Sequence, residues 1–370
     1  MSSPSASGLD AVVVAETALS DVDGELGRLV IRGYSVEHLV ERGTFEDACG
    51  LMWNATFPSA GERDGLRSSL SEARQHAFAL LTSLGGALDS TDGMEALRTA
   101  VGHLRTSDRD DDPVRLTGAI PVFAAAWARR QSGQPPVPPQ AGLSYAADYL
   151  QMLAGTVPEP PRVAALDAYL CCVVDHGMNA STFVARIVAS TGSDLVSAIV
   201  AAIGALKGPL HGGAPGPVLD MLDAIGDPAH ARTWLDAELA AGRRLMGMGH
   251  RVYRVRDPRA AALEHAMSLL ERTGAAGERL TLARAVERDA ERLLTERHPE
   301  RSLRANVEFY TAVLLEAIGI PRTLFSPTFA ASRVAGWCAH VDEQRRVGRL
   351  IRPASTYVGP AAGVTGVPSA

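Results

Sequence analysis

The amino-acid sequence predicts an all-α protein with a small β-hairpin near its N-terminus. Most long segments of the 370-residue chain are rich in Ala, Leu, Glu and Arg, which favour helices, and alternating β-branched runs are scarce. The segment 282–294 shows the helical pattern, because Leu282, Val286, Leu293 and Leu294 fall near one stripe. About twenty helices, long or short, are expected from this periodicity.

The hairpin is predicted from two short β-branched segments, 12–14 and 29–31. Between them lies the turn-forming sequence Asp21-Val22-Asp23-Gly24. Two strands joined by such a turn form a hairpin, so we expect a small sheet ahead of the helices.

Helix ends are marked at several places further along the chain. Asp194 is expected to open the segment 195–206, and Gly319 with Pro321 to close the segment that begins near Asn306. Ser326 before Pro327 predicts an N-cap followed by Pro at the first helical position.

The composition limits the classes of function. A net charge of −6 and a pI near 5.9 argue against nucleic acid as the main partner. No apolar run approaches the ~20 residues of a membrane-spanning helix, and Met1 to Gly8 lacks a signal-peptide pattern. We therefore expect a cytoplasmic protein with no membrane partner.

No metal site is predicted. The four cysteines form no CxxC pair, so they are interpreted as free and buried. The acidic segment 107–113 is interpreted as a solvated loop. An acidic metal site there is the alternative, but no glycine-spaced ligand loop follows.

Three histidines stand in unusual surroundings, in the motifs around His176, His211 and His250. His211 lies in Gly208-Pro209-Leu210-His211-Gly212-Gly213, where glycines allow a ligand to approach the backbone. An imidazole donor in such a loop could polarise a carbonyl oxygen. The alternative is a histidine in an ordinary turn.

His250 follows Gly247-Met248-Gly249 and precedes a cluster of arginines. A dinucleotide-binding loop is excluded, because Val252 stands at the last glycine position and no strand precedes the motif. The arginines predict either an anion site or a solvated basic face; they are Arg251, Arg254, Arg256 and Arg259.

Glu308 is a candidate base. Asn306 is a plausible N-cap, which places Glu308 in the first turn of a helix, where the dipole favours an ionised carboxylate. The alternative is a glutamate that only matches the dipole.

Together these motifs resemble the citrate synthase family, over about residues 8–360. The resemblance is carried by the ordered series Asn179-Ala180-Ser181-Thr182-Phe183, Ser190-Thr191-Gly192-Ser193-Asp194 and Gly208-Pro209-Leu210-His211-Gly212-Gly213. The chain length is similar to that of the smaller bacterial branch, which includes 2-methylcitrate synthases.

The resemblance implies a two-domain helical fold around a cleft. A large domain would comprise residues 1–212 and 316–370, and a small domain, 213–315, would be inserted between them. It also implies a homodimer, in which the C-terminal arm carries Arg352 to the site of the partner subunit.

The resemblance further implies an acyl-CoA and oxaloacetate as substrates, with acetyl-CoA as co-substrate and no metal or bound cofactor. His211 would stabilise the enol of the thioester, Glu308 would remove the methyl proton, and His250 would polarise the oxaloacetate ketone. The implied oxaloacetate ligands are His176, Arg259, Arg333 and Arg352, and the implied CoA ligands are Arg254 and Arg301.

Glu308 departs from the family pattern, which has Asp at this position. The extra methylene extends the side chain by about 1.5 Å, and a misplacement of about 1 Å can cost ~10²-fold in rate. The first expectation is citrate synthase. The alternatives are 2-methylcitrate synthase, which uses propionyl-CoA, and a non-catalytic homologue that binds CoA or oxaloacetate.

Overall fold

The computed structural model describes residue 9 and residues 12–106, 112–212, 215–250, 252–272, 274 and 277–360. This part of the chain forms fifteen α-helices, four short 3-10 helices and one three-stranded sheet. The prediction of a mainly helical protein with a small N-terminal sheet is confirmed. Most of the acidic segment 107–113 lies outside the described residues.

The sheet has the antiparallel order β1 (Ser20–Asp23), β2 (Arg28–Ile31), β3 (Tyr34–Ser35). The predicted first strand, 12–14, is wrong. Val13 is 86% exposed, whereas the segment predicted as a turn supplies the strand. Asp23 instead closes the turn, because its Oδ1 accepts the backbone N–H groups of Glu25 and Leu26.

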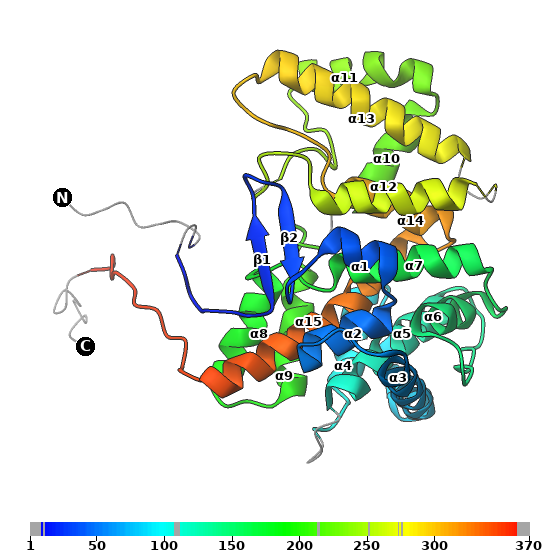
Figure 1. Cartoon of the computed structure of the whole chain (residues 1–370), viewed down its shortest axis with the longest axis vertical. Helices are drawn as coiled ribbons and strands as arrows, with labels where there is room; N and C mark the ends of the chain where they lie inside the picture. The colour runs from blue at the N-terminus through cyan, green and yellow to red at the C-terminus, as the bar shows by residue number, and fades with distance from the viewer. Residues whose placement is uncertain are drawn as a thin grey trace, which may run out of the picture.

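The helices gather into two groups in Figure 1. The lower group contains α1 (Val36–Arg42), α2 (Phe45–Asn54), α3 (Ala60–Leu80), α4 (Gly93–Val101), α5 (Asp112–Gln131), α6 (Tyr145–Ala154), α7 (Pro160–Val173), α8 (Ala180–Ser190), α9 (Leu195–Leu206) and α15 (Phe325–Val347). The upper group contains α10 (Pro215–Ile225), α11 (Ala231–Ala240), α12 (Pro258–Glu271), α13 (Gly277–Arg297) and α14 (Val307–Ala317). The 3-10 helices are η2 (Leu81–Ser83), η3 (Gly85–Leu88), η4 (Pro228–His230) and η5 (Arg322–Leu324).

Contacts between helices follow the same grouping. In the upper group, α10 and α12 pack on α14, and α11 packs on α13. Helix α12 also packs on α7 and α1 of the lower group, so the two groups meet along this helix. The predicted domain boundaries at 213 and 315 fall near the start of α10 and within α14, and they remain a prediction.

Helix α15 runs through the lower group and packs on α5, α7, α8 and α9. It begins at Phe325, so the prediction of Ser326 as an N-cap is wrong. The 3-10 helix η5 runs directly into α15, and the Ser326 hydroxyl donates instead to the carbonyl oxygen of Gly212 at 2.6 Å. Asp194 and Asn306 are confirmed as N-caps of α9 and α14.

The interior is one contiguous apolar cluster that includes residues from both groups of helices. All four cysteines are buried and free, as predicted. No helix in the described ranges is long and apolar enough to cross a bilayer.

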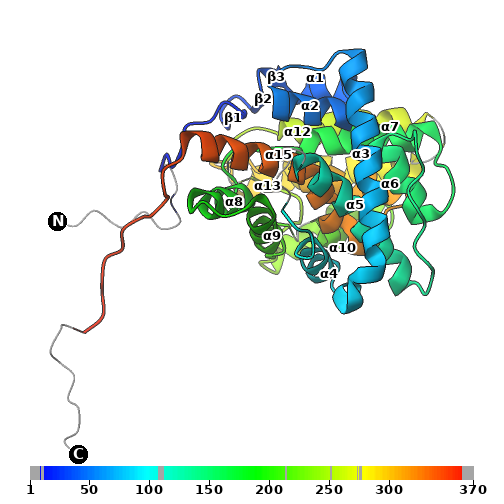
Figure 2. The same cartoon turned by 90° about the horizontal axis from the view of Figure 1, so that it is seen from below.

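After Val347 the chain leaves the helices. Residues 348–360 form no helix or strand, and Figure 2 shows this segment running away from the helical body. The backbone N–H of Ile351 donates to Ser190 Oγ at 3.0 Å, which anchors the start of the segment to the end of α8.

Candidate active site

Six of the nine predicted site residues are drawn together from different elements. His176 follows α7, His211 follows α9, His250 precedes α12, Arg259 starts α12, Glu308 starts α14, and Arg333 lies in the middle of α15. The rings of His176 and His250 lie 5.7 Å apart. The guanidinium of Arg333 perturbs the pKa values of His176, His211 and Glu308, so these residues lie near one another.

His250 is held by its own loop. Its Nδ1 accepts the backbone N–H groups of Val252 at 2.9 Å and Tyr253 at 3.0 Å. Two donors on Nδ1 require the ring proton of a neutral imidazole to lie on Nε2. Burial, with help from Arg259, lowers the pKa of His250 to about 4, so the ring is neutral at pH 7. Its ring proton therefore lies on Nε2, which is 3.3 Å from Arg259 Nη2.

The His250 loop is joined to the start of α14 by backbone pairing. Gly249 N–H donates to Arg304 at 2.7 Å, and Asn306 N–H donates to Gly247 at 2.9 Å. Gly247 has φ +74°, and a Cβ there would lie 2.9 Å from the Phe309 side chain, so only glycine fits. This pairing holds His250 and Glu308 in one local frame.

Arg259 is oriented by Asp257, a residue to which the sequence analysis assigned no role. Asp257 accepts hydrogen bonds from the Arg259 backbone N–H, from Nε at 3.1 Å and from Nη2 at 2.8 Å. It also accepts the N–H of Val307 at 3.2 Å, which links α12 to α14. The Asp257 carboxylate raises the pKa of Arg259, although burial opposes this. The Asp-Pro sequence that opens a helix was the available signal.

Arg333 is buried without a carboxylate partner. Arg333 is 1% exposed, and its Nε donates to the Val173 carbonyl oxygen at 2.6 Å. It forms no ion pair with a described residue. Burial lowers the pKa of Arg333 to about 10, only partly offset by Asp175. A buried cation without an ion pair favours an anionic ligand beside it.

His211 is positioned by Ser181 in the first turn of α8. His211 Nε2 lies 2.8 Å from Ser181 Oγ, which also accepts from Trp337 Nε1 and lies 2.8 Å from Asn179 Oδ1. The hydroxyl has one proton, which it gives either to Asn179 or to His211. In the second arrangement the proton of neutral His211 lies on Nδ1. Burial lowers the pKa of His211 to about 4.

Glu308 lies in the first turn of α14, where Asn306 Oδ1 caps its backbone N–H at 3.0 Å, as predicted. Its carboxylate makes no hydrogen bond to another described residue. Burial raises the pKa of Glu308 to about 7, with Arg259 and Arg333 opposing and Asp257 adding to the shift. Such a carboxyl group can exchange a proton near neutral pH.

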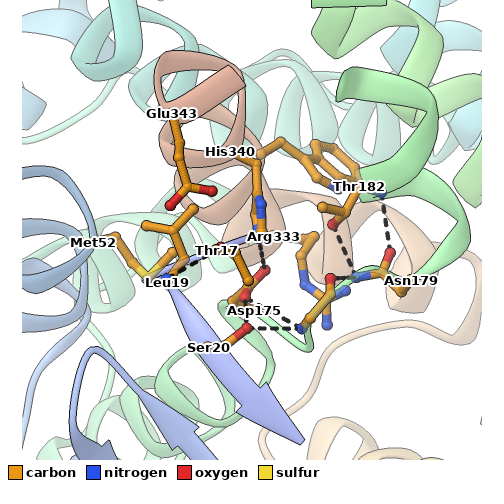
Figure 3. Close-up of polar contacts among 12 residues, drawn as sticks. Thr17, Leu19, Ser20, Met52, Asp175, Asn179, Thr182, Arg333, His340 and Glu343 are labelled. Carbon is orange, nitrogen blue, oxygen red and sulfur yellow. Dashed lines mark hydrogen bonds and ion pairs between the residues drawn. The ribbon is translucent and has the colours of Figure 1, made fainter. Parts of the chain in front are cut away.

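A buried polar network, partly drawn in Figure 3, supports the His176 loop. Asp175 accepts from Ser20 Oγ at 2.5 Å and from His340 Nε2 at 3.1 Å. Arg186 donates to His340 Nδ1 at 3.0 Å, so this histidine is satisfied on both ring nitrogens. Sequence reasoning missed these residues, because their partners are 154 to 165 positions away and no local motif marks them.

Three predicted residues lie outside this group. Arg254, Arg301 and Arg352 are all exposed, and none forms an ion pair with a described residue. Their roles as ligands remain predictions.

The arrangement combines buried cations, neutral imidazoles and a carboxyl group of raised pKa. Arginines bind carboxylates, a neutral imidazole N–H stabilises a developing oxyanion, and the carboxyl group can accept a proton. No group of three or more His, Cys, Asp or Glu residues in the described part of the chain is arranged to hold a metal ion.

Comparisons with known proteins agree on one family. The family model described as "Citrate synthase, C-terminal domain" matches residues 8–354. The 2-methylcitrate synthase of Mycobacterium tuberculosis strain H37Rv is 38% identical over 367 residues, covering 95% of this chain and 90% of the relative. Citrate synthase 2 of Bacillus subtilis strain 168 is 36% identical over 364 residues, covering 95% of both.

Solved structures give the same result. The crystal structure of citrate synthase from Thermotoga maritima is 32% identical with a TM-score of 0.83, covering 96% of both chains. Citrate synthase from Thermoplasma acidophilum, solved as a ternary complex with carboxymethyl coenzyme A and oxaloacetate, is 28% identical with a TM-score of 0.85 over 96% of both chains.

Proposed function

The chain belongs to the citrate synthase family, and on that premise we propose that it condenses acetyl-CoA with oxaloacetate to form citrate and CoA. As in the rest of the family, the chain is an enzyme of the acyltransferase type that joins an acyl-CoA to a 2-oxo acid. The finer proposals concern the acyl group, the residue roles and the assembly.

The observation that carries the proposal is that Arg333 is buried without an ion pair to a described residue, near Arg259 and two neutral histidines. Oxaloacetate has two carboxylates and a ketone. Arg259 and Arg333 are proposed to bind carboxylate oxygens, with His176 as a further ligand. Burial, with Arg259 and Arg333, lowers the pKa of His176 well below its usual value, so it too is neutral. A dry site strengthens these charge-assisted hydrogen bonds.

Enolisation is assigned to Glu308 and His211. The methyl group of a thioester is a weak acid, so a carboxylate alone cannot remove its proton. Ionised Glu308 takes this proton while neutral His211 donates a hydrogen bond to the thioester oxygen as charge develops there. The donor is Nδ1–H when the Ser181 hydroxyl points its proton at His211 Nε2 and not at Asn179 Oδ1.

Carbon–carbon bond formation is assigned to His250. The enol carbon attacks the oxaloacetate ketone, and the Nε2–H of His250 polarises the ketone oxygen and then protonates it. The proton that Glu308 took from the methyl group balances this transfer when it returns His250 to its neutral form. The two backbone donors on Nδ1 hold the required tautomer. The resulting acyl-CoA thioester is hydrolysed in the same site, which releases CoA.

A second donor, propionyl-CoA, is favoured by the relative named 2-methylcitrate synthase. Acetyl-CoA is preferred here because Glu308 extends further into the site than Asp would, by about one carbon–carbon bond of ~1.5 Å. That extension leaves less room beside the acyl methyl group.

The assembly and the CoA site complete the proposal. We propose a cytoplasmic homodimer in which the extended segment 348–360 carries Arg352 to the site of the partner subunit. Arg254 and Arg301 are proposed to bind CoA phosphates, supported by their exposure and lack of ion pairs. Helices α10–α14 are proposed to form a small domain, about residues 213–315, that closes on the large domain (residues 1–212 and 316–370).

The direct experiment measures release of free CoA thiol by the purified protein with oxaloacetate and either acetyl-CoA or propionyl-CoA. We expect a higher kcat/KM with acetyl-CoA. A preference for propionyl-CoA would show that the protein is a 2-methylcitrate synthase and not a citrate synthase. Release from neither donor, by a protein that still binds oxaloacetate, would contradict the enzyme assignment.

The same assay separates the roles of the histidines. His211→Ala is expected to abolish turnover but to leave oxaloacetate binding largely intact, because His211 is assigned to the thioester. Loss of oxaloacetate binding in this variant would show that the assigned role is wrong.

A further inference from the structure

The β1–β2 hairpin contacts the loops of two site histidines at its two ends. At its base, Ser20 Oγ donates to Asp175 and accepts the backbone N–H of Gly177 at 2.9 Å. Asp175 and Gly177 are the two neighbours of His176. The base of the hairpin is therefore hydrogen-bonded to the residues on both sides of His176.

The tip of the hairpin docks on the loop that follows His250. Arg254 N–H donates to the Gly24 carbonyl oxygen at 2.8 Å. A Cβ at Gly24 would lie 2.3 Å from the Val252 carbonyl oxygen, and one at Gly27 would lie 2.5 Å from Val255 Cγ2. At Gly24 the two backbones approach too closely for a Cβ, whereas at Gly27 a Cβ would meet the Val255 side chain and the φ of +61° also favours glycine.

The hairpin between these ends is stiff. Its strands pair in continuous register from Ser20↔Ile31 to Asp23↔Arg28, and Asp23 ties down the tip. Its inner residues are buried, since Leu29 and Ile31 are 0% exposed. Figure 1 shows β1 and β2 extending from the lower group of helices toward the upper one.

Tyr253 contacts both histidines. Tyr253 lies in the docked loop, and its hydroxyl is 3.1 Å from His176 Nε2. The same ring lies 4.7 Å from the His250 ring, centroid to centroid. A shift of the docked loop would therefore change the positions of His250 and Tyr253 relative to His176.

We propose that the β1–β2 hairpin is a positioning element of the oxaloacetate site, which sets the spacing of His176 and His250 by holding both loops. This proposal rests on the proposed function, because it assumes that both histidines contact oxaloacetate. Gly24 and Gly27 act through the loop 252–256 and touch no reacting atom.

The first test is Gly24→Ala. The new methyl group must displace the Val252 carbonyl by about 1 Å, and misplacement of that size can lower kcat/KM for oxaloacetate by about 10²-fold. We expect a lower kcat and a higher KM for oxaloacetate. Gly65→Ala is the matched control, because a Cβ at Gly65 in α3 meets nothing within 4 Å.

The second test uses rescue. Gly27→Ala places a methyl group against Val255, whose side chain is 42% exposed and can be shortened with little effect on the core. Gly27→Ala alone is expected to raise the KM for oxaloacetate. The double variant Gly27→Ala with Val255→Ala is expected to bring this KM most of the way back to the wild-type value. The positive φ of residue 27, +61°, strains Ala equally in both variants, so rescue reports on docking alone.

The outcomes separate this proposal from the proposed function. If the wild type releases no CoA, the proposed function fails before the hairpin is tested. A second outcome is an active wild type and two variants that yield less folded protein but have an unchanged KM for oxaloacetate. In that case the hairpin only stabilises the fold, and the inference is wrong. Failure of Val255→Ala to rescue Gly27→Ala would also contradict it.

Discussion

Arg74 and Arg333 are a matched pair of buried arginines in two regions of the molecule. Arg74, between α3 and α6, is 0% exposed, stacks on the Tyr145 ring at 5.6 Å and donates to the Leu143 carbonyl oxygen. Arg333, on α15, is 1% exposed, stacks on the Phe329 ring at 4.5 Å and donates to the Val173 carbonyl oxygen.

The two arginines differ in whether a carboxylate binds them. Arg74 Nε binds Asp148 at 2.5 Å with both side chains fully buried, whereas Arg333 forms no ion pair within the described part of the chain. A buried charge costs several kcal/mol unless it is paired. The charge of Arg74 is therefore neutralised within the protein, whereas under the proposed function the charge of Arg333 is neutralised by the substrate. Four predictions test this division, in order of their expected effect on turnover.

Glu308→Gln should give the largest loss of turnover. Removal of a general base costs ~10²–10⁴-fold in rate, and Gln keeps nearly the same shape. We expect kcat to fall by about 10³-fold, while oxaloacetate binding, measured by calorimetry, stays close to the wild-type value. A kcat within tenfold of the wild type would exclude Glu308 as the base.

Arg333→Met should come next. Loss of one partner of a buried charge pair costs about 2–5 kcal/mol in binding, so kcat/KM for oxaloacetate should fall by about 10²–10³-fold. The melting temperature should stay the same or rise, because the variant removes a buried charge that has no carboxylate partner in the free protein. A large drop in melting temperature with unchanged kinetics would reverse the assignment.

The pH profile should show a smaller, graded effect. Glu308 must be ionised to act, and its pKa is raised to about 7, so kcat/KM for acetyl-CoA should fall about tenfold per pH unit below 7 and level off above it. His211 and His250, with pKa values of about 4, stay neutral from pH 5 to 9 and should add no second limb. Rates that stay constant down to pH 5 would contradict the raised pKa of Glu308.

Arg74→Met should have the smallest effect on turnover and the largest on stability. Breaking a buried pair by removing one partner costs about 3–5 kcal/mol, because Asp148 is left buried and unpaired. We expect a clear drop in the free energy of unfolding, measured with urea, and an unchanged kcat/KM per folded enzyme. The double variant Arg74→Met with Asp148→Leu should recover much of the loss.

The resemblance to the citrate synthase family implied the six site residues that lie near one another. The sequence pattern itself predicted the helical class, the hairpin region and the Asn306 cap. These features depend on local periodicity, on capping and turn residues, or on motifs within about ten positions. The first strand was misplaced because 12–14 is apolar but contacts no sheet partner. The Ser326 cap was wrong because a preceding 3-10 turn already extends the helix.

Long-range pairing was beyond the reach of the sequence. Nothing near Asp175 indicates that His340 binds it from 165 positions away, and nothing near Gly24 indicates that Val252 packs on it. Likewise, the sequence alone does not distinguish Arg74 from Arg333. Which arginine receives a carboxylate is decided only when α3 meets α6 and α15 crosses α7.

The most direct measurement of this distinction is the oxaloacetate-dependent shift in melting temperature of the wild type, Arg74→Met and Arg333→Met. A ligand that binds only the folded state at 100 times its Kd stabilises it by about 2.7 kcal/mol. We predict that oxaloacetate raises the melting temperature of the wild type and, from a lower starting value, of Arg74→Met, but not of Arg333→Met. An equal shift in Arg333→Met would contradict the central claim that this buried, unpaired arginine is reserved for the substrate.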